Sequence, residues 1–350
     1  MRRSILFAAA CAVALAVALA QQPSGGGPYK VTKKVKAGGA GGFDYVYADE
    51  AGRKLYIPRS GNPGRITVFD LDTLEPAGEI PNASAHGAAV SPKSNHGFAS
   101  SKPVVMWDSK TLATIKTIEV DGGPDGILYE PFKDQVWVFS HRAPNATVIS
   151  AADGSIVKTL DLGGGPEQAA SDGKGHLYVD LEDKGNIAVV DTNALTVTGH
   201  YDLAGKGNGC AGLAMDVKNR ILFASCRNPQ NMVVLSADDG KILTALPIGM
   251  GTDGAVFNPN TMEAFSSQGD GTLTVIKEES PSSFVVEQNL ETMRTAKTLT
   301  LDRKANRILL IAAEFEPPPA APAAPAPGGR GGRGRGPMVP DSFTILAVGK

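Results

Sequence analysis

Carboxylates and one histidine recur along the chain at a regular spacing of about 40 residues. These side chains belong to Asp44, His86, Asp125, Glu167 and Asp253. With Ala211 and Thr295 as further equivalents, the successive steps are 42, 39, 42, 44, 42 and 42 residues. Carboxylates that are held close together either raise one another's pKa or bind a cation. Oxygen ligands suit Ca²⁺ or Mg²⁺, and a histidine among carboxylates also suits Zn²⁺ or Mn²⁺.

A second set of polar side chains lies where the second strand of a repeated unit is expected to end. It comprises Arg59, His141, Arg142, Arg227 and Asn228. Arginine presents a planar fork that binds carboxylate or phosphate groups in a bidentate manner. The sequence leaves three interpretations of the two sets open. The first is structural, because Asp and Glu before a strand often cap turns or bond loop amides. The second is that the two sets bind a small ligand or a metal ion, and the third is that they carry out catalysis.

The repeated unit that carries these side chains is clearest between Gly122 and Gly163. It contains four short apolar or alternating runs, at 127–129, 136–139, 147–150 and 156–162. Turn sequences such as Ala152-Asp153-Gly154 separate the runs, so the unit predicts a four-stranded antiparallel meander. Seven such units with a period near 40 residues predict a seven-bladed β-propeller, which is an all-β fold.

The two ends of the chain predict how the ring closes. The segment Lys30–Lys36 resembles the fourth strands of other units, such as 114–120 and 156–162. The segment Ser342–Val348 resembles a third strand, and no fourth strand follows it. We therefore expect the N-terminal strand to complete the last blade, which removes open sheet edges. Because the first strands of a propeller line its central channel, both sets of side chains are expected at one end of that channel, the channel mouth.

Length, charge and missing motifs limit the classes of function. The chain has 350 residues, and the repeats assign 29–350 to one propeller domain. The formal net charge is −2, so nucleic acid is not expected as a partner. An insertion at 314–340, rich in Pro and Ala and then in Gly and Arg, is expected to be a disordered loop in the last blade. Motifs for covalent haem, serine hydrolases, zincins and phosphate loops are absent from the sequence.

Residues 1–20 are predicted to be a signal peptide, followed by a flexible leader at 21–28. Arg2 and Arg3 precede an apolar run from Ile5 to Leu19, and 18–20 fit the small-residue cleavage pattern. A membrane anchor and, through Cys11, a lipoprotein are the alternatives. Cleavage would leave a periplasmic or secreted protein without a stable membrane span, in an oxidising compartment.

Cys210 and Cys226 are the two cysteines beyond the N-terminal segment. The first is expected to begin the first strand of the fifth unit, and the second to end its second strand. Antiparallel pairing around the turn at 217–219 brings the two residues opposite each other, which favours a disulfide. Two buried free thiols are the alternative.

The sequence resembles the YVTN/YncE-type β-propeller repeat proteins of bacteria. The resemblance rests on Gly123-Pro124-Asp125-Gly126, on 165–167, on the strands at 136–138 and 177–179, and on 189–191. It covers about 29–350 without the insertion, and it implies an exported seven-bladed propeller. Some related propellers bind DNA or partner proteins, and others resemble metal-dependent lactonases or the non-catalytic subunits of amine dehydrogenases.

Two hypotheses about function follow. The first is a non-enzymatic binding or scaffold protein, expected to be a monomer, whose channel-mouth loops bind a small molecule or an envelope protein without a required cofactor. The second is a metal-assisted, lactonase-like hydrolase or lyase. In that case the metal ligands or the base would come from Asp44, His86, Asp125, Glu167 and Asp253.

Overall fold

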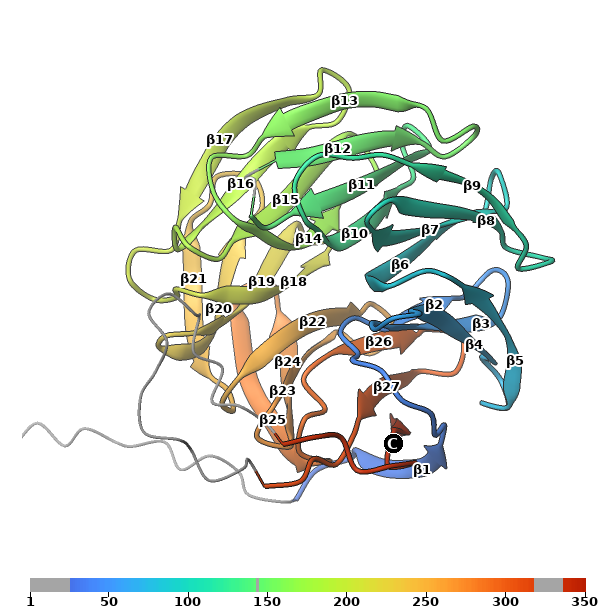
Figure 1. The fold of residues 1–350 in the computed structure, drawn as a ribbon. Helices are drawn as coiled ribbons and strands as arrows, with labels where there is room; N and C mark the ends of the chain where they lie inside the picture. Colours follow the sequence, from blue (N-terminus) through green and yellow to red (C-terminus); the bar gives the residue numbers. More distant parts are fainter. Residues whose placement is uncertain (1–25, 143–144, 318–335) are drawn as a thin grey trace, which may run out of the picture.

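The structure is a computed structural model that describes residues 26–142, 145–317 and 336–350. In these ranges the chain forms 28 β-strands and no α-helix. The strands make seven four-stranded antiparallel sheets, which stand as blades around a central channel (Figure 1). The structure therefore confirms the predicted seven-bladed β-propeller.

The first six blades each use four consecutive strands, ordered from the channel outward. Blade 1 contains β2 (Tyr47–Asp49), β3 (Lys54–Arg59), β4 (Arg65–Asp70) and β5 (Pro76–Pro81). Blade 2 contains β6 (Ala85–Ser91), β7 (His96–Ser101), β8 (Val104–Asp108) and β9 (Thr114–Ile118). Blade 3 contains β10 (Pro124–Glu130), β11 (Gln135–Ser140), β12 (Asn145–Ser150) and β13 (Ile156–Asp161).

Blades 4 to 6 follow the same order. Blade 4 contains β14 (Pro166–Ser171), β15 (His176–Leu181), β16 (Asn186–Asp191) and β17 (Thr196–Asp202). Blade 5 contains β18 (Cys210–Asp216), β19 (Ile221–Arg227), β20 (Gln230–Ser236) and β21 (Ile242–Pro247). Blade 6 contains β22 (Thr252–Asn258), β23 (Glu263–Gln268), β24 (Thr272–Ser280) and β25 (Ser283–Glu291).

Blade 7 joins the two ends of the chain. It contains β26 (Leu299–Asp302), β27 (Arg307–Ala312), β28 (Thr344–Gly349) and, outermost, β1 (Lys30–Lys36). β1 pairs antiparallel with β28, with Val35 opposite Ile345 and Val31 opposite Val348. This arrangement confirms the predicted closure of the ring by the N-terminal strand, which is visible beside the C-terminus in Figure 1. β1 presents four exposed lysines, and charges of this kind protect an edge strand from pairing with another chain.

The hydrophobic core is divided among the interfaces between neighbouring blades. Every blade of the closed ring has a neighbour on each side. The apolar side chains of its strands therefore pack against the preceding blade on one face and against the following blade on the other. Tyr56 of blade 1 and Trp107 of blade 2 illustrate this, since both are fully buried and their ring centroids lie 5.5 Å apart. Each blade is thus stabilised by its neighbours, and the ring is the smallest complete unit.

Cys210 and Cys226 form a disulfide between the start of β18 and the end of β19. The two residues are directly paired across the antiparallel ladder, and both are buried in the cluster between blades 4 and 5. The bond therefore fixes the end of blade 5 that faces the channel mouth.

Loss of this disulfide is expected to lower the free energy of unfolding by about 2–3 kcal/mol. The two cysteines are 16 residues apart, and closing a loop of this length restricts the unfolded chain. Urea denaturation of the double variant Cys210→Ala/Cys226→Ala should show this loss without reductant, and dithiothreitol should then destabilise only the wild type. Equal stability of the two proteins without reductant would contradict the expectation.

The predicted insertion at 314–340 leaves blade 7 between β27 and β28. At its base, Phe315 and Met338 form an antiparallel bridge, and the Glu316 N–H donates to the Pro337 carbonyl at 2.9 Å. Residues 318–335 of this insertion lie outside the described residues, as do the predicted signal peptide (1–20) and residues 21–25 of the leader. No helix in the described ranges is long and apolar enough to cross a membrane.

Candidate functional site at the channel mouth

The channel mouth is the end of the channel where the inner strands begin and where the second strands end. In blades 2 to 6 the pairing of the inner strand is interrupted near its start by a β-bulge. The residues inside these bulges are His86, Asp125, Glu167, Ala211 and Asp253, together with their neighbours. A bulge bends the strand and redirects one side chain, so it explains why this position of the repeat carries the ionisable groups.

The residue after the bulge position decides how close the inner strands approach. In blade 3 this residue is Gly126, where a Cβ atom would lie 2.6 Å from the backbone oxygen of Glu167. Blades 1 and 4 have Tyr45 and Gln168 at this place instead. The Tyr45 hydroxyl donates to Oε2 of Glu167 at 2.9 Å, and the Gln168 amide bonds the backbone of blades 5 and 6. These two side chains project into the channel beneath the mouth. They line a cavity there with a volume of about 230 Å³.

Two permanent cations neutralise one side of the mouth. Lys297 of blade 7 donates to Oδ1 of Asp44 at 3.0 Å and also to Asp253. Arg227 donates to Asp253 and to Glu182, and its Nε donates to the Thr252 carbonyl at 2.9 Å. Asp253 is therefore held between two cations. Burial opposes the charge of Lys297, but Asp253 and Asp44 outweigh it and raise the pKa of the ammonium group.

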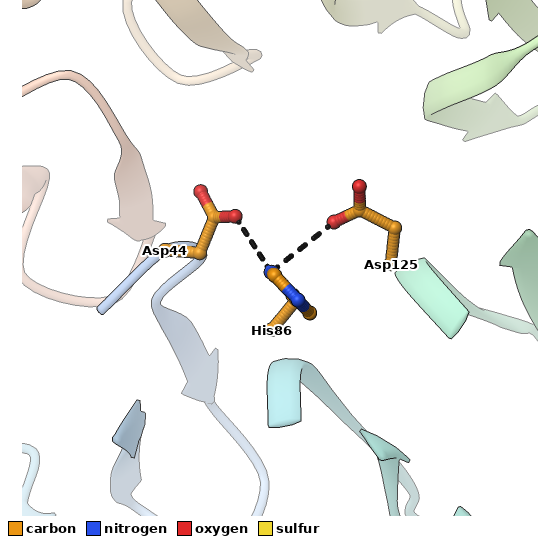
Figure 2. Close-up of side chains that lie close together, drawn as sticks. All are labelled: Asp44, His86 and Asp125. Carbon is orange, nitrogen blue, oxygen red and sulfur yellow. Dashed lines mark hydrogen bonds and ion pairs between the residues drawn. The ribbon is translucent and has the colours of Figure 1, made fainter. Parts of the chain in front are cut away.

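His86 lies between the carboxylates of Asp44 and Asp125 (Figure 2). Its Nδ1 lies 2.9 Å from Oδ2 of Asp44 and 3.5 Å from Oδ1 of Asp125. The hydrogen bond with Asp44 raises the pKa of His86 against the effect of burial, and Asp125 adds to the rise. Both carboxylates face the same nitrogen, so Nδ1 carries the proton that lies between them. The two carboxylates therefore favour the protonated, positively charged form of His86.

His141 makes a different contact on the next blade. Its Nε2 lies 3.2 Å from Oε2 of Glu182, and its Nδ1 lies 3.6 Å from Oε1 of Glu167. A carboxylate that accepts from one ring nitrogen fixes the tautomer and directs the lone pair of the other nitrogen. Glu182 thus orients the imidazole ring so that Nδ1 faces Glu167 and lies near Asp125, a position from which it can bind a metal ion.

Two groups of three side chains have ligand atoms that all lie within 4.8 Å of one another: Asp44, His86 and Asp125, and Asp125, His141 and Glu167. Asp125 belongs to both groups. In the first group Asp44 already has Lys297 and His86 as partners, and these lower its pKa although burial opposes them. Among the described residues, neither Asp125 nor Glu167 of the second group forms an ion pair with Lys297 or Arg227, so this group is the better candidate for a metal ion.

Carboxyl groups of the second group carry the signs of uncompensated negative charge. Burial raises the pKa of Glu167 to about 8, and the charges of Asp125, Asp253 and Glu182 act in the same direction. Burial also raises the pKa of Asp125; His86 opposes this and Asp44 reinforces it. A carboxylate that is buried beside other negative charges tends to take up a proton. A bound divalent cation would relieve the same repulsion between the carboxylates.

The two remaining predicted arginines, Arg59 and Arg142, lie in different surroundings. Arg59 is only 1% exposed: its guanidinium stacks on the Phe343 ring at 3.7 Å and donates to backbone carbonyls of Gly38, Gly39 and Gly41. Its donors are therefore turned towards the loop before blade 1 and away from a ligand. Arg142 is exposed beside the mouth.

Three residues at the mouth were not predicted from the sequence: Tyr45, Glu182 and Lys297. Glu182 directly follows the second strand of its blade, as His141 does, and Arg227 ends the second strand of blade 5, so the repeat itself could have identified Glu182. Lys297 comes two residues after Thr295, the position that the spacing suggested for blade 7. Thr295 instead bonds the backbone of Ala313 in its own blade.

Without a metal ion, the contribution of Glu167 to stability is expected to fall as the pH rises from about 4.5 to about 8. The folded protein keeps the Glu167 proton up to a pKa of about 8, whereas the unfolded chain releases it near the ordinary value of 4.5. The unfolded state thus binds fewer protons in this window, and stability declines with pH.

Urea denaturation between pH 5 and 8.5 in the presence of a chelator measures this effect. The wild type should lose more stability across the range than Glu167→Gln, which lacks the titrating group. In a second series without the chelator, saturating Zn²⁺ should reduce the difference, because the ion replaces the proton. Parallel pH profiles for the two proteins would contradict the raised pKa.

Comparison with known proteins places the fold but not the site. No protein-family model and no curated protein sequence matches the chain. Among solved structures, the "Structure of U3-55K" is similar with a TM-score of 0.69 and 11% sequence identity, over 91% of this chain and 98% of that chain. The "Crystal structure of RRP9 WD40 repeats" is similar with a TM-score of 0.69 and 11% identity, over 92% and 98% of the two chains. At this identity the likeness establishes a seven-bladed, WD40-like propeller.

Proposed function

We propose that this protein is a non-enzymatic binding protein whose channel mouth holds a divalent cation and binds its ligand there. The cation would be held by Asp125, His141 and Glu167. The observation that carries the proposal is the contact between Glu182 and His141. A carboxylate behind a histidine is the usual support of a protein metal ligand, because it fixes the orientation of the ring.

The ligand set indicates which cations fit. One imidazole nitrogen with two carboxylates suits Zn²⁺ or Mn²⁺ better than Ca²⁺, which prefers six or more oxygen ligands. Three protein ligands would leave at least one position for a group from outside the protein. Arg142, which is exposed beside this position, offers a guanidinium to an anionic part of such a ligand.

Glu182→Gln is expected to weaken Zn²⁺ binding by about tenfold, because the amide can turn its NH₂ towards His141 and favour the wrong tautomer. Isothermal titration calorimetry of the purified protein measures the affinity. Asp183→Asn is the matched control, since Asp183 is the next residue and contacts the Gly165 N–H and Lys184 rather than His141. Equal affinities of Glu182→Gln and wild type would remove the support for a metal at His141.

A metal-assisted hydrolase is the second candidate, and the open coordination position favours it. A bound cation there could lower the pKa of a water molecule and polarise a substrate carbonyl. The three side chains that hold the ion would then position it against the substrate. A panel of lactones tests this activity. Hydrolysis that requires Zn²⁺ and is lost in Asp125→Asn would establish it, whereas no hydrolysis of any lactone would leave binding as the function.

We further propose that the protein is exported and belongs to the YVTN/YncE type of propeller. The basic and apolar pattern of residues 1–20 supports export, and the disulfide in blade 5 fits an oxidising compartment. The Gly-Pro-Asp-Gly sequence at 123–126 supports the family assignment, since it forms the bulge that carries Asp125. Fractionation of the native host, followed by N-terminal sequencing, tests whether Gln21 is the first residue of the exported protein.

A further inference from the structure

A larger cavity lies at the other end of the channel, on the face opposite the channel mouth. This lower cavity has a volume of about 610 Å³ and is formed mainly by the inner strands β18, β22 and β26 and the turns that follow them. Gln168 lines both cavities. Its side-chain oxygen accepts from the N–H groups of Leu213 and Ala255 at 3.0 Å each, so the amide is fixed between the two compartments.

The wall of the lower cavity is apolar. It is formed by Leu213, Met215, Val217, Val256, Phe257 and Leu301. Val217 is 37% exposed, and Met215, Val256 and Leu301 are only half-buried. Apolar side chains that line a concave surface gain free energy when an apolar group covers them, at about 25 cal/mol per Å².

The rim of the lower cavity carries positive charge. Lys174 and Lys218 are exposed, and neither ammonium group has an acidic partner among the described residues. Arg303, also on the rim, is paired with Glu50. The one acidic side chain of the lining, Asp216, is 1% exposed and accepts from the Lys218 N–H at 2.9 Å, so it does not neutralise the rim. The two ends of the channel thus differ in charge.

We propose that the lower cavity binds a small amphipathic organic anion. Its apolar part would lie against Val217, Val256 and Leu301, and its carboxylate or sulfonate would lie between Lys174 and Lys218. The volume falls within the range of about 300–1,000 Å³ that is typical of small-molecule sites. The cavity is therefore of a size for a single small molecule. This proposal does not depend on the cation at the channel mouth, because none of Asp125, His141 and Glu167 lines the lower cavity.

The fluorescent probe 1-anilinonaphthalene-8-sulfonate, an aromatic ring system with one sulfonate, tests the proposal directly. Titration of the purified, fully folded protein should show one saturable site whose affinity falls as the salt concentration rises. The double variant Lys174→Glu/Lys218→Glu should raise the dissociation constant at least tenfold. Lys304→Glu is the matched control, since Lys304 is exposed near the same face but does not line the cavity; it should change the constant less than twofold.

Thermal melting of each variant shows that binding is compared between folded proteins, since both lysines are exposed and their replacement should leave the melting temperature unchanged. Asp125→Asn should bind the probe as the wild type does, so this site and the cation site can fail separately. A wild type that does not bind the probe, or a double variant that binds it with wild-type affinity, would overturn the proposal.

Discussion

Asp125→Asn is expected to weaken the binding of Zn²⁺ to the channel mouth by about a hundredfold. Asp125 is the one residue that belongs to both groups of potential metal ligands, and its carboxylate lies 3.5 Å from His86. An amide has almost the same shape but no negative charge, so a cation would lose a strong ligand. A hundredfold change corresponds to about 2.7 kcal/mol of binding free energy.

Asp44→Asn is the matched control for this experiment, because it belongs only to the group that contains His86. It should change the affinity less than about fivefold, since Lys297 and His86 already occupy its oxygens. Isothermal titration calorimetry of both variants measures the difference. If Asp44→Asn lost as much affinity as Asp125→Asn, the ion would lie beside His86, and the assignment of Asp125, His141 and Glu167 would be incorrect.

Asp302→Ala is expected to produce the largest loss of stability, about 3 kcal/mol in the free energy of unfolding. Asp302 is fully buried at the end of β26 in blade 7 and accepts two hydrogen bonds from Arg53 of blade 1, at 2.9 and 2.8 Å. Arg307 of its own blade donates to the same carboxylate at 3.2 Å. Removing the carboxylate leaves two arginines without their shared partner in a partly buried place, which costs far more than losing a surface pair.

The effect of Asp302 can be separated from the general effect of losing an ion pair of Arg53. Asp72 also contacts Arg53, at 2.7 Å, but 53% of its side chain is exposed. Asp72→Ala should therefore lower the free energy of unfolding far less than Asp302→Ala does in urea denaturation. Equal losses for the two variants would show that the buried pair does not hold blades 7 and 1 together.

The fold could be predicted because the information for it is local and repeated seven times. Turn sequences and alternating apolar runs specify each blade, and the likeness of 30–36 to other fourth strands specified the closure of the ring. Much of the site followed from the same repeat, since a bulge at a fixed place directs His86, Asp125 and Glu167 to one end of the channel.

What could not be predicted depends on contacts between distant parts of the chain. The partners of Arg59 are the loop at 38–41 and Phe343 of the C-terminal segment, and no local pattern connects them. Most repeats begin with a glycine-containing sequence such as 123–126, but the last repeat has none at its start. Its first strand could therefore not be aligned closely enough to identify Lys297 as a residue of the mouth. The division of the mouth into a neutralised side and a side with excess negative charge follows from Lys297 and Arg227, and hence from the closed ring.

The most direct test of a cation at the channel mouth is the metal content of the purified protein, determined by elemental analysis together with thermal melting before and after chelation. We predict one tightly bound divalent ion per chain, a lower melting temperature after chelation, and recovery when Zn²⁺ or Mn²⁺ is returned. Asp125→Asn should contain much less of the ion, and its melting temperature should respond less to the chelator than that of the wild type. A wild type without bound metal, whose melting temperature also does not respond to added Zn²⁺ or Mn²⁺, would contradict the account, and the acidic residues would then serve the structure of the loops.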